Sequence, residues 1–78
     1  MLKAEIYTDY SVIEMNNARF FVIGRCLNGS RHYSEYLSLS KAFEIFDIYS
    51  DIVEYFGGGT VEIWADVGYD ILIRQKSV

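Results

Sequence analysis

The sequence lacks proline, has a single cysteine and contains no long apolar run. One cysteine excludes an intrachain disulfide and fits a reducing compartment. No stretch reaches the roughly 18 uncharged apolar residues that a membrane-spanning helix needs, and residues 1–10 do not contain the apolar core of a signal peptide. These absences predict a soluble cytoplasmic protein without a membrane segment.

Linkers, internal repeats and low-complexity tracts are also missing, so we expect one domain over residues 1–78. A chain of this length is near the lower limit for a core that folds unaided. Its hydrophobic share of 51% is typical of a globular protein. Seven Tyr, five Phe and one Trp are many for so small a domain, so several aromatic rings must lie at the surface.

Basic side chains are absent between Ala42 and Ile73. This segment has seven acidic residues, whereas the remaining chain has four acidic and seven basic residues, so the formal net charge of −4 combines −7 with +3. The seven are Glu44, Asp47, Asp51, Glu54, Glu62, Asp66 and Asp70. An acidic balance argues against nucleic acid as a direct ligand, because phosphate binding needs clustered Lys and Arg.

Alternation and helical spacing predict the element order β-β-β-α-β-β. The predicted strands are Lys3–Ile13, Arg19–Leu27, Arg31–Leu37, Thr60–Ala65 and Tyr69–Lys76. The predicted helix follows a cap at Ser38 or Ser40 and ends near Phe56, before Gly57-Gly58-Gly59. We therefore expect an α+β fold, in which one amphipathic helix crosses one face of a mainly antiparallel sheet of four or five strands.

Asn28-Gly29, between the second and third predicted strands, is the strongest short hairpin signal. A two-residue loop would place Gly24 opposite Tyr33, so that the tyrosine ring could cover the glycine. A three-residue loop would change this register. The sequence leaves both loop lengths open.

The sheet face that the helix leaves open is expected to show Glu62, Trp64, Leu72 and Arg74, while Tyr69 and the alternate residues of the last two strands face inward. A tryptophan on an open face favours burial against another chain. One hypothesis is therefore a homodimer or partner contact through Trp64 and Leu72. The other is local packing of Trp64 with Tyr7 and the aliphatic part of Arg74.

Four of the acidic residues form what we call the acidic stripe: Glu44, Asp47, Asp51 and Glu54. Their spacing of 3, 4 and 3 puts them on one side of the predicted helix, where like charges repel and no lysine at i+4 offsets them. The stripe is either a solvated face or an electrostatic patch for a basic partner surface. Such patches raise association rates and select partners.

Apolar side chains flank the acidic stripe, with Phe43 on one side and Ile48 and Tyr55 on the other. Either sheet edges cover them or they are anchors at an interface, because aromatic rings beside charges are typical of binding hot spots. A pocket between helix and sheet would need polar groups that point inward, and we expect only the hydroxyl of Tyr49 there.

No catalytic, metal or nucleotide motif stands out. Gly57-Gly58-Gly59 follows a helix and precedes a strand, which is the opposite order from a phosphate-binding loop. Cys26 and His32 each lack a second ligand at metal spacing and an orienting group for catalysis. Carboxylates along a straight helix do not converge on a cation. We expect a non-enzymatic protein without cofactor or metal.

The chain resembles the small phage-encoded inhibitors of bacterial defence, anti-CRISPR proteins in particular. The resemblance is one of size, acidity and aromatic content, and of the hairpin at Asn28-Gly29 that leads into a serine-capped amphipathic helix. No motif and no functional residue are carried over. It implies a steric or phosphate-mimicking block of a nuclease or CRISPR effector complex where that partner holds nucleic acid. Arg19, Arg25 and Arg31 depart from a pure nucleic-acid mimic and suggest an interface with both signs of charge.

The sequence therefore predicts a binding protein that blocks a basic, nucleic-acid-handling surface through the acidic stripe, with contributions from Phe43, Tyr55 and Trp64. The alternative is a small structural or assembly protein that oligomerises through the open sheet face. Salt should separate the two, because charge-led binding weakens with ionic strength and apolar association does not.

Overall fold

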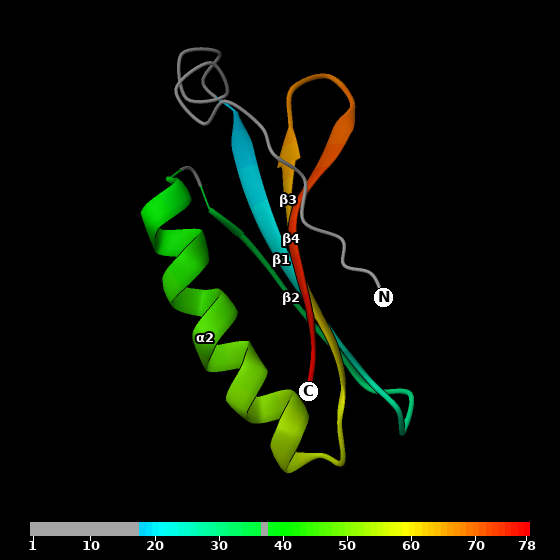
Figure 1. Cartoon of the computed structure of the whole chain (residues 1–78). Coiled ribbons are helices and arrows are strands. Elements are labelled where there is room, and N and C mark those ends of the chain that lie inside the picture. The colour runs from blue at the N-terminus through cyan, green and yellow to red at the C-terminus, as the bar shows by residue number, and fades with distance from the viewer. Residues whose placement is uncertain (1–17, 37) are drawn as a thin grey trace.

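A hairpin, a helix and a second hairpin follow one another along the chain (Figure 1). This computed structural model describes residues 18–36 and 38–78. The elements are β1 (Arg19–Cys26), β2 (Arg31–Tyr36), α2 (Leu39–Tyr55), β3 (Gly59–Asp66) and β4 (Asp70–Ser77). The strands form one antiparallel sheet in the order β2-β1-β3-β4, and α2 crosses one of its faces. The predicted small α+β fold is confirmed, and the predicted strand Lys3–Ile13 lies outside the described residues.

The first strand of the described sheet, β1, is paired along both of its sides. Phe20 faces Tyr36 of β2 on one side and Ala65 of β3 on the other. β1 and β3 are therefore the interior strands, and β2 and β4 are the edges. Helix α2 carries the chain from the β2 edge across the sheet face to the far side of β1.

The loop between β1 and β2 has three residues, Leu27–Gly29. Cys26 N–H donates to the Ser30 carbonyl at 2.9 Å, and Gly29 N–H donates to the Cys26 carbonyl at 3.0 Å. Gly29 has a φ of 97°, the left-handed conformation that ends a three-residue hairpin loop. The side-chain oxygen of Asn28 accepts from Ser30 N–H at 2.9 Å and holds the turn.

The three-residue loop sets the register of the hairpin. Gly24 faces His32, and Tyr33 faces Ile23, so the two-residue alternative is wrong. His32 consequently lies on the helix side, where its ring is 5.8 Å from the ring of Tyr49. It also stacks on Phe56 at 6.0 Å. Tyr33 is turned to the open face instead of covering the glycine.

Both ends of α2 are closed by the residue types that the sequence indicates. Ser38 is the N-cap rather than Ser40, since its hydroxyl accepts from Lys41 N–H at 3.2 Å. At the C-terminus Gly57 has a φ of 101°. Gly57 N–H donates to the Glu54 carbonyl at 3.1 Å and Gly58 N–H to the Val53 carbonyl at 2.9 Å, the two bonds of a Schellman motif.

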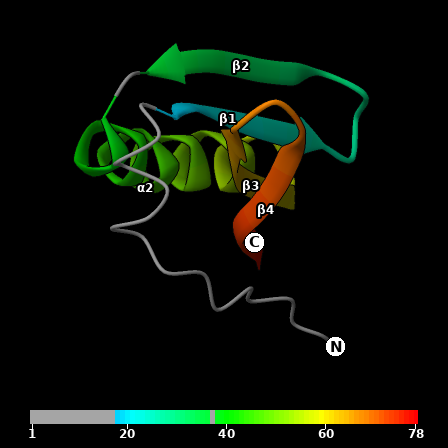
Figure 2. The same cartoon turned by 90° about the horizontal axis from the view of Figure 1, so that it is seen from above.

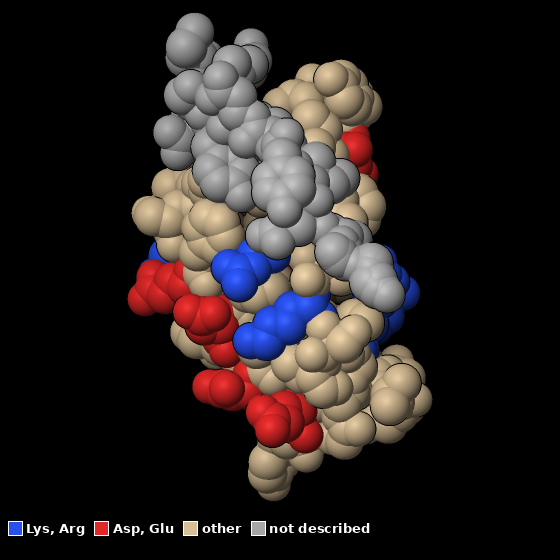
Figure 3. Space-filling view, in the orientation of Figure 1, with Lys and Arg blue, Asp and Glu red and all other residues tan. Residues whose placement is uncertain are grey.

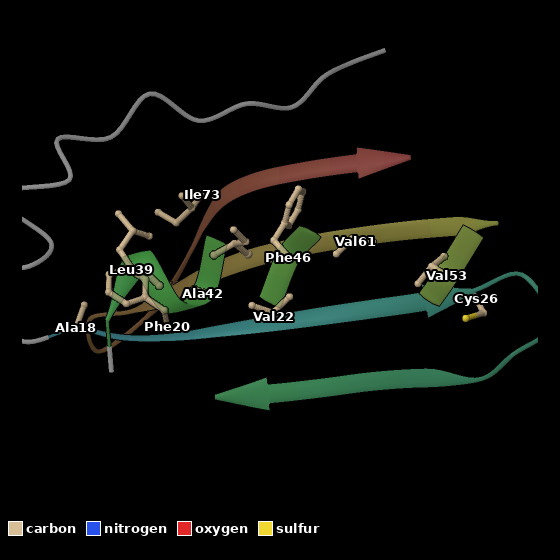
Figure 4. Packing of buried hydrophobic residues seen from close by; sticks show 12 residues of the cluster. Ala18, Phe20, Val22, Cys26, Leu39, Ala42, Phe46, Val53, Val61 and Ile73 are labelled. Atoms are coloured by element: carbon tan, nitrogen blue, oxygen red, sulfur yellow. The ribbon is translucent and has the colours of Figure 1, made fainter. Parts of the chain in front are cut away.

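The core lies between α2 and the sheet (Figure 4). Its fully buried members with less than 2% exposure are Phe20, Val22, Ala42, Phe46, Val53, Val61, Ile63, Ala65 and Ile73. The inward direction predicted for alternate residues of β3 is thereby confirmed. Ser50 is also buried, and its hydroxyl donates to the Phe46 carbonyl at 2.8 Å. Tyr49 is therefore not the only hydroxyl on the inward side of the helix.

A bulge interrupts the pairing of β3 with β4. Ile63 faces Arg74 and Trp64 faces Leu72, which leaves Ile73 as the extra residue of β4. A bulge shifts the alternation of side chains between the two faces of a sheet. Ile73 is fully buried. After it, Arg74 and Lys76 pair with Ile63 and Val61, whose side chains face the helix.

Arg74 therefore does not lie on the open face, contrary to the expectation from regular alternation. Its guanidinium carbon is 5.3 Å from the ring centroid of Phe46, and Lys76 Nζ is 5.8 Å from the same centroid. Tyr69, expected to face inward, is 69% exposed. It precedes β4, and its carbonyl accepts from Val67 N–H at 3.0 Å, so it belongs to the turn.

Two glycines after α2 should respond differently to alanine. At Gly57 a Cβ would meet nothing within 4 Å, so only the left-handed backbone is strained. At Gly59 it would lie 1.9 Å from the Arg25 carbonyl oxygen. We expect Gly57→Ala to lower the free energy of unfolding by about 1 kcal/mol. Gly59→Ala should lower it by more than about 3 kcal/mol or prevent folding.

Urea unfolding of the two variants beside the wild type measures both effects. Equal losses in the two variants would contradict the close approach of β1 and β3 at this end of the sheet.

Candidate functional site

All four carboxylates of the acidic stripe are exposed on α2. Figure 3 shows acidic side chains along the helix, with basic side chains beside them on the same face. Lys41 Nζ is 3.2 Å from Glu44 Oε1, so Glu44 is neutralised from the preceding turn. No lysine follows a stripe residue at i+4, as the sequence indicates, but Lys41 reaches Glu44 from three residues before it. Within residues 18–36 and 38–78, Asp47, Asp51 and Glu54 have no ion pair or hydrogen bond to their side chains.

The separation of acidic and basic residues along the sequence is not kept in the three-dimensional structure. Arg74 and Lys76 follow the acidic segment in the chain, but β4 returns them to the helix side of the sheet. Both lie over the ring of Phe46 at distances typical of cation–π contacts. The acidic stripe therefore has positive charge close to it, and this face carries both signs.

The apolar flanks of the stripe differ from one another. Phe43 is partly buried and packs against the core. Tyr55 is 84% exposed and Ile48 is 46% exposed, and these two are one heptad apart on the helix. Asp51 lies between them, at i+3 from Ile48 and i−4 from Tyr55, so its carboxylate is bordered by an apolar row. Of the predicted flanking anchors, Tyr55 and Ile48 reach solvent and Phe43 faces inward.

Among the described residues, three aromatic rings meet on the opposite side of the sheet, and we call them the aromatic cluster: Phe21, Tyr33 and Trp64. The rings of Phe21 and Trp64 stack at 6.3 Å with an interplanar angle of 5°. The ring of Tyr33 is 5.8 Å from that of Phe21 and tilted by 42°. Leu72 faces Trp64 from β4, so the predicted pair Trp64 and Leu72 does share the open face. The sequence did not place Phe21 and Tyr33 together on the open face, because their meeting depends on the hairpin register.

A carboxylate holds Trp64 in place. Trp64 Nε1–H donates to Glu62 Oε1 at 2.9 Å, and Arg25 Nε–H donates to Glu62 Oε2 at 3.3 Å. The Glu62 side chain is only 12% exposed, whereas that of Arg25 is 45% exposed. Bonds to an ionised acceptor are stronger than neutral ones. The orientation of the indole is therefore fixed by Glu62 as well as by stacking.

The three arginines that suggested a mixed-charge interface have different roles. Arg25 is bound to Glu62, and Arg19 lies 4.0 Å from Glu35 across the hairpin. Arg31 is exposed and has no ion pair in the part of the chain that the structure describes.

Partial loss of water around the phenol, and then the Glu35 carboxylate, raise the pKa of Tyr33, so its phenol is neutral at pH 7.

No metal or dyad geometry is seen in the described segments. No three His, Cys, Asp or Glu side chains gather there as a metal site. Cys26 and His32 share the helix side of neighbouring strands, but Gly24 is the residue that faces His32. Nε2 of His32 is buried, and no hydrogen-bond partner for it lies among residues 18–36 and 38–78. In these same residues, no helix has the length and apolar character needed to cross a membrane.

Comparisons of this chain with protein-family models, with curated proteins and with solved structures find no match. No residue receives a role from a relative. The acidic stripe and the aromatic cluster, on opposite faces of the domain, are the two candidate interaction sites.

The Glu62 bridge predicts a difference between two substitutions. Glu62→Gln keeps an oxygen for Trp64 Nε1–H and loses only the attraction to a half-exposed arginine, so it should cost about 0.5 kcal/mol of unfolding free energy. Glu62→Ala leaves the half-buried indole N–H without a partner and should cost about 1–2 kcal/mol. Urea unfolding followed by the fluorescence of Trp64, the only tryptophan, measures both. Equal losses would show that the ion pair, not the indole bond, matters.

Proposed function

We propose that this protein is a non-enzymatic binding protein that occupies a basic, nucleic-acid-handling surface of a partner protein through the acidic stripe of α2. The observation that supports it best is the state of Asp47, Asp51 and Glu54. These carboxylates are exposed and lack ion pairs among the described residues. Like charges on successive helical turns repel one another, and a basic partner would relieve that repulsion.

Helix α2, which carries the acidic stripe, is fixed at its ends and in the core, and this favours binding without rearrangement. Ser38 and Gly57 close the two ends of α2, and Phe46 and Val53 anchor it in the core. Successive carboxylates stand about one helical turn, roughly 5.4 Å, apart along a straight line. Such a row can imitate a phosphate backbone. A preformed row also loses little conformational entropy when a partner binds.

The border of the stripe adds apolar contact area. Tyr55 and Ile48 project to solvent on either side of Asp51, and an exposed aromatic ring beside charge is the usual composition of a binding hot spot. Arg74 and Lys76 lie on the other side and give the face a second sign of charge. A mixed pattern selects the orientation of a partner better than a uniform one. Phe43 contributes indirectly, because it packs α2 against the core.

The resemblance to anti-CRISPR proteins, in size, acidity and build, suggests the class of partner. We propose a CRISPR effector complex or a nuclease, met in the cytoplasm of a bacterial host if the gene is carried by a phage. The inhibitor would occupy the positively charged path of the nucleic acid, and would itself bind none.

Amide substitution of the stripe tests this function. Glu44→Gln, Asp47→Asn, Asp51→Asn and Glu54→Gln together should leave the fold intact and raise the free energy of unfolding by a few tenths of a kcal/mol. Affinity for the basic partner should fall at least about tenfold. Tagged protein is used to capture partners from bacterial lysate at low and high salt, with heparin as a competing polyanion, and the affinity of the captured partner is then measured.

The matched control is Asp66→Asn with Asp70→Asn, which removes acidic charge from the turn between β3 and β4. This control should keep its partner. Binding that survives all four amide substitutions would mean that the stripe is only a solvated face.

The aromatic cluster favours a second function, that of a small assembly protein that associates through its open sheet face. Stacked rings that include a half-buried tryptophan are typical of an apolar contact. Under this function Trp64→Ala should convert an oligomer to a monomer, and high salt should not, because apolar association is not screened. Sedimentation in low and high salt measures both. An unchanged mass and an unchanged partner affinity in Trp64→Ala would exclude a role for this face.

A further inference from the structure

Within residues 18–36 and 38–78, the outer side of the edge strand β2 is uncovered. Among these residues β2 pairs only with β1, and Figure 2 shows it at the border of the described elements. An edge strand presents unpaired N–H and C=O groups, which are a template for another strand.

The hairpin register shows which groups are unpaired. Cys26 N–H donates to the Ser30 carbonyl, so Ser30 turns its backbone groups toward β1. In an antiparallel ladder every second residue does the same, and the residues between turn theirs outward. Arg31, Tyr33 and Glu35 therefore direct their N–H and C=O groups to the free edge.

We propose that two copies of this chain associate through β2, as antiparallel neighbours related by a two-fold axis at Tyr33. This register joins the three outward residues of one copy to those of the other. Tyr33 faces Tyr33, and Arg31 of each copy faces Glu35 of the other. Every facing pair then exchanges two backbone hydrogen bonds, and the two sheets become one continuous sheet.

Charge complementarity supports a second copy as the occupant. Arg31 is exposed, and no ion pair to it is found in the described residues. The Glu35 side chain is 47% exposed, and its contact with Arg19 is long, at 4.0 Å, so it can accept a second cation. Opposite charges that face each other across strands attract, and like charges in that place repel. Because the axis repeats the pair, each dimer contains the Arg31–Glu35 contact twice.

The aromatic cluster continues across this edge. Tyr33 is 57% exposed, and its side chain lies on the open face next to Phe21. At the two-fold axis the Tyr33 rings of both copies become cross-strand neighbours, an arrangement that stabilises paired strands. The two clusters then form one apolar row on the open face of the joined sheet.

The other edge is less suited to such pairing. Strand β4 carries a bulge at Ile73, which interrupts the regular ladder. Beyond the bulge, pairing of two copies about Gln75 would set Arg74 against Lys76. Like charges and bulges are the usual protection of edge strands. β2 has neither and is self-complementary.

Sedimentation equilibrium of the full chain, from low to high micromolar concentration, tests the dimer. The wild type should shift from one chain to two with increasing concentration. Arg31→Glu places two glutamates opposite each other and should raise the dissociation constant about tenfold or more. Arg31→Glu combined with Glu35→Arg restores facing opposite charges and should recover most of the loss.

Two further variants separate this interface from others. Tyr33→Pro removes an N–H that points to the free edge, where proline is tolerated, and should abolish the dimer while the β1–β2 hairpin remains. Asp51→Lys is the control for charge reversal: it changes the net charge by two, as Arg31→Glu does, but it lies on α2. It should leave the dimer intact. Circular dichroism confirms that each variant is folded.

A wild type that stays monomeric over the whole concentration range overturns the proposal. So does a dimer that persists in both Arg31→Glu and Tyr33→Pro. The dimer is independent of the proposed inhibitory function, since the amide variant of the acidic stripe should still dimerise.

Discussion

Packing of Phe46 connects the interior of the domain to its charged face. The ring is fully buried between α2 and the sheet, and it is also the surface over which Arg74 and Lys76 lie. A shift of the helix would therefore disturb the core and the charge pattern together. The bulge at Ile73 is part of the same arrangement, because it places the side chains of Arg74 and Lys76 on the helix side of the sheet. The position of the acidic stripe depends on this contact more than on any interaction within the stripe.

Features governed by local chemistry were predictable from the sequence. Ser38 accepts a first-turn N–H, Gly57 adopts a left-handed conformation, and Asn28-Gly29 closes a hairpin, each through its own side chain or its lack of one. The type and approximate bounds of the four described strands and of the helix followed from hydrophobic periodicity, and the structure confirms them.

Features that depend on pairing between distant segments were not predictable. The loop length decides whether His32 or Tyr33 faces Gly24, and dipeptide preference alone does not fix it. The bulge that moves Arg74 to the helix side has no signal in the alternation of β4. For the same reason the acidic stripe is closer to positive charge in the structure than the sequence indicates. Arg74 and Lys76 are distant from the helix in sequence, and only the pairing of β4 brings them to the helix side.

The two candidate surfaces lie on opposite sides of a two-layer domain, so one partner does not exclude the other. In a dimer joined at β2, the two-fold axis runs through the sheet and places both helices on the same face. Two acidic stripes would then approach a partner together, and linked contacts of this kind bind more tightly than either alone. A continuous aromatic row would lie on the reverse side. The domain would thus have a charged side and an apolar side, both repeated by symmetry.

The enclosed position of β1 has a consequence for how the chain reaches this structure. Its hairpin with β2 and the helix α2 require only contacts between near neighbours in sequence, which form early and fast. The central pair of the sheet joins Cys26 to Gly59 and Arg19 to Asp66, and it closes a loop that contains both β2 and α2. Loop closure of this length loses chain entropy before the core repays it, and folding slows as contacts become more distant in sequence. Pairing of β1 with β3 is therefore the step expected to limit the rate of folding.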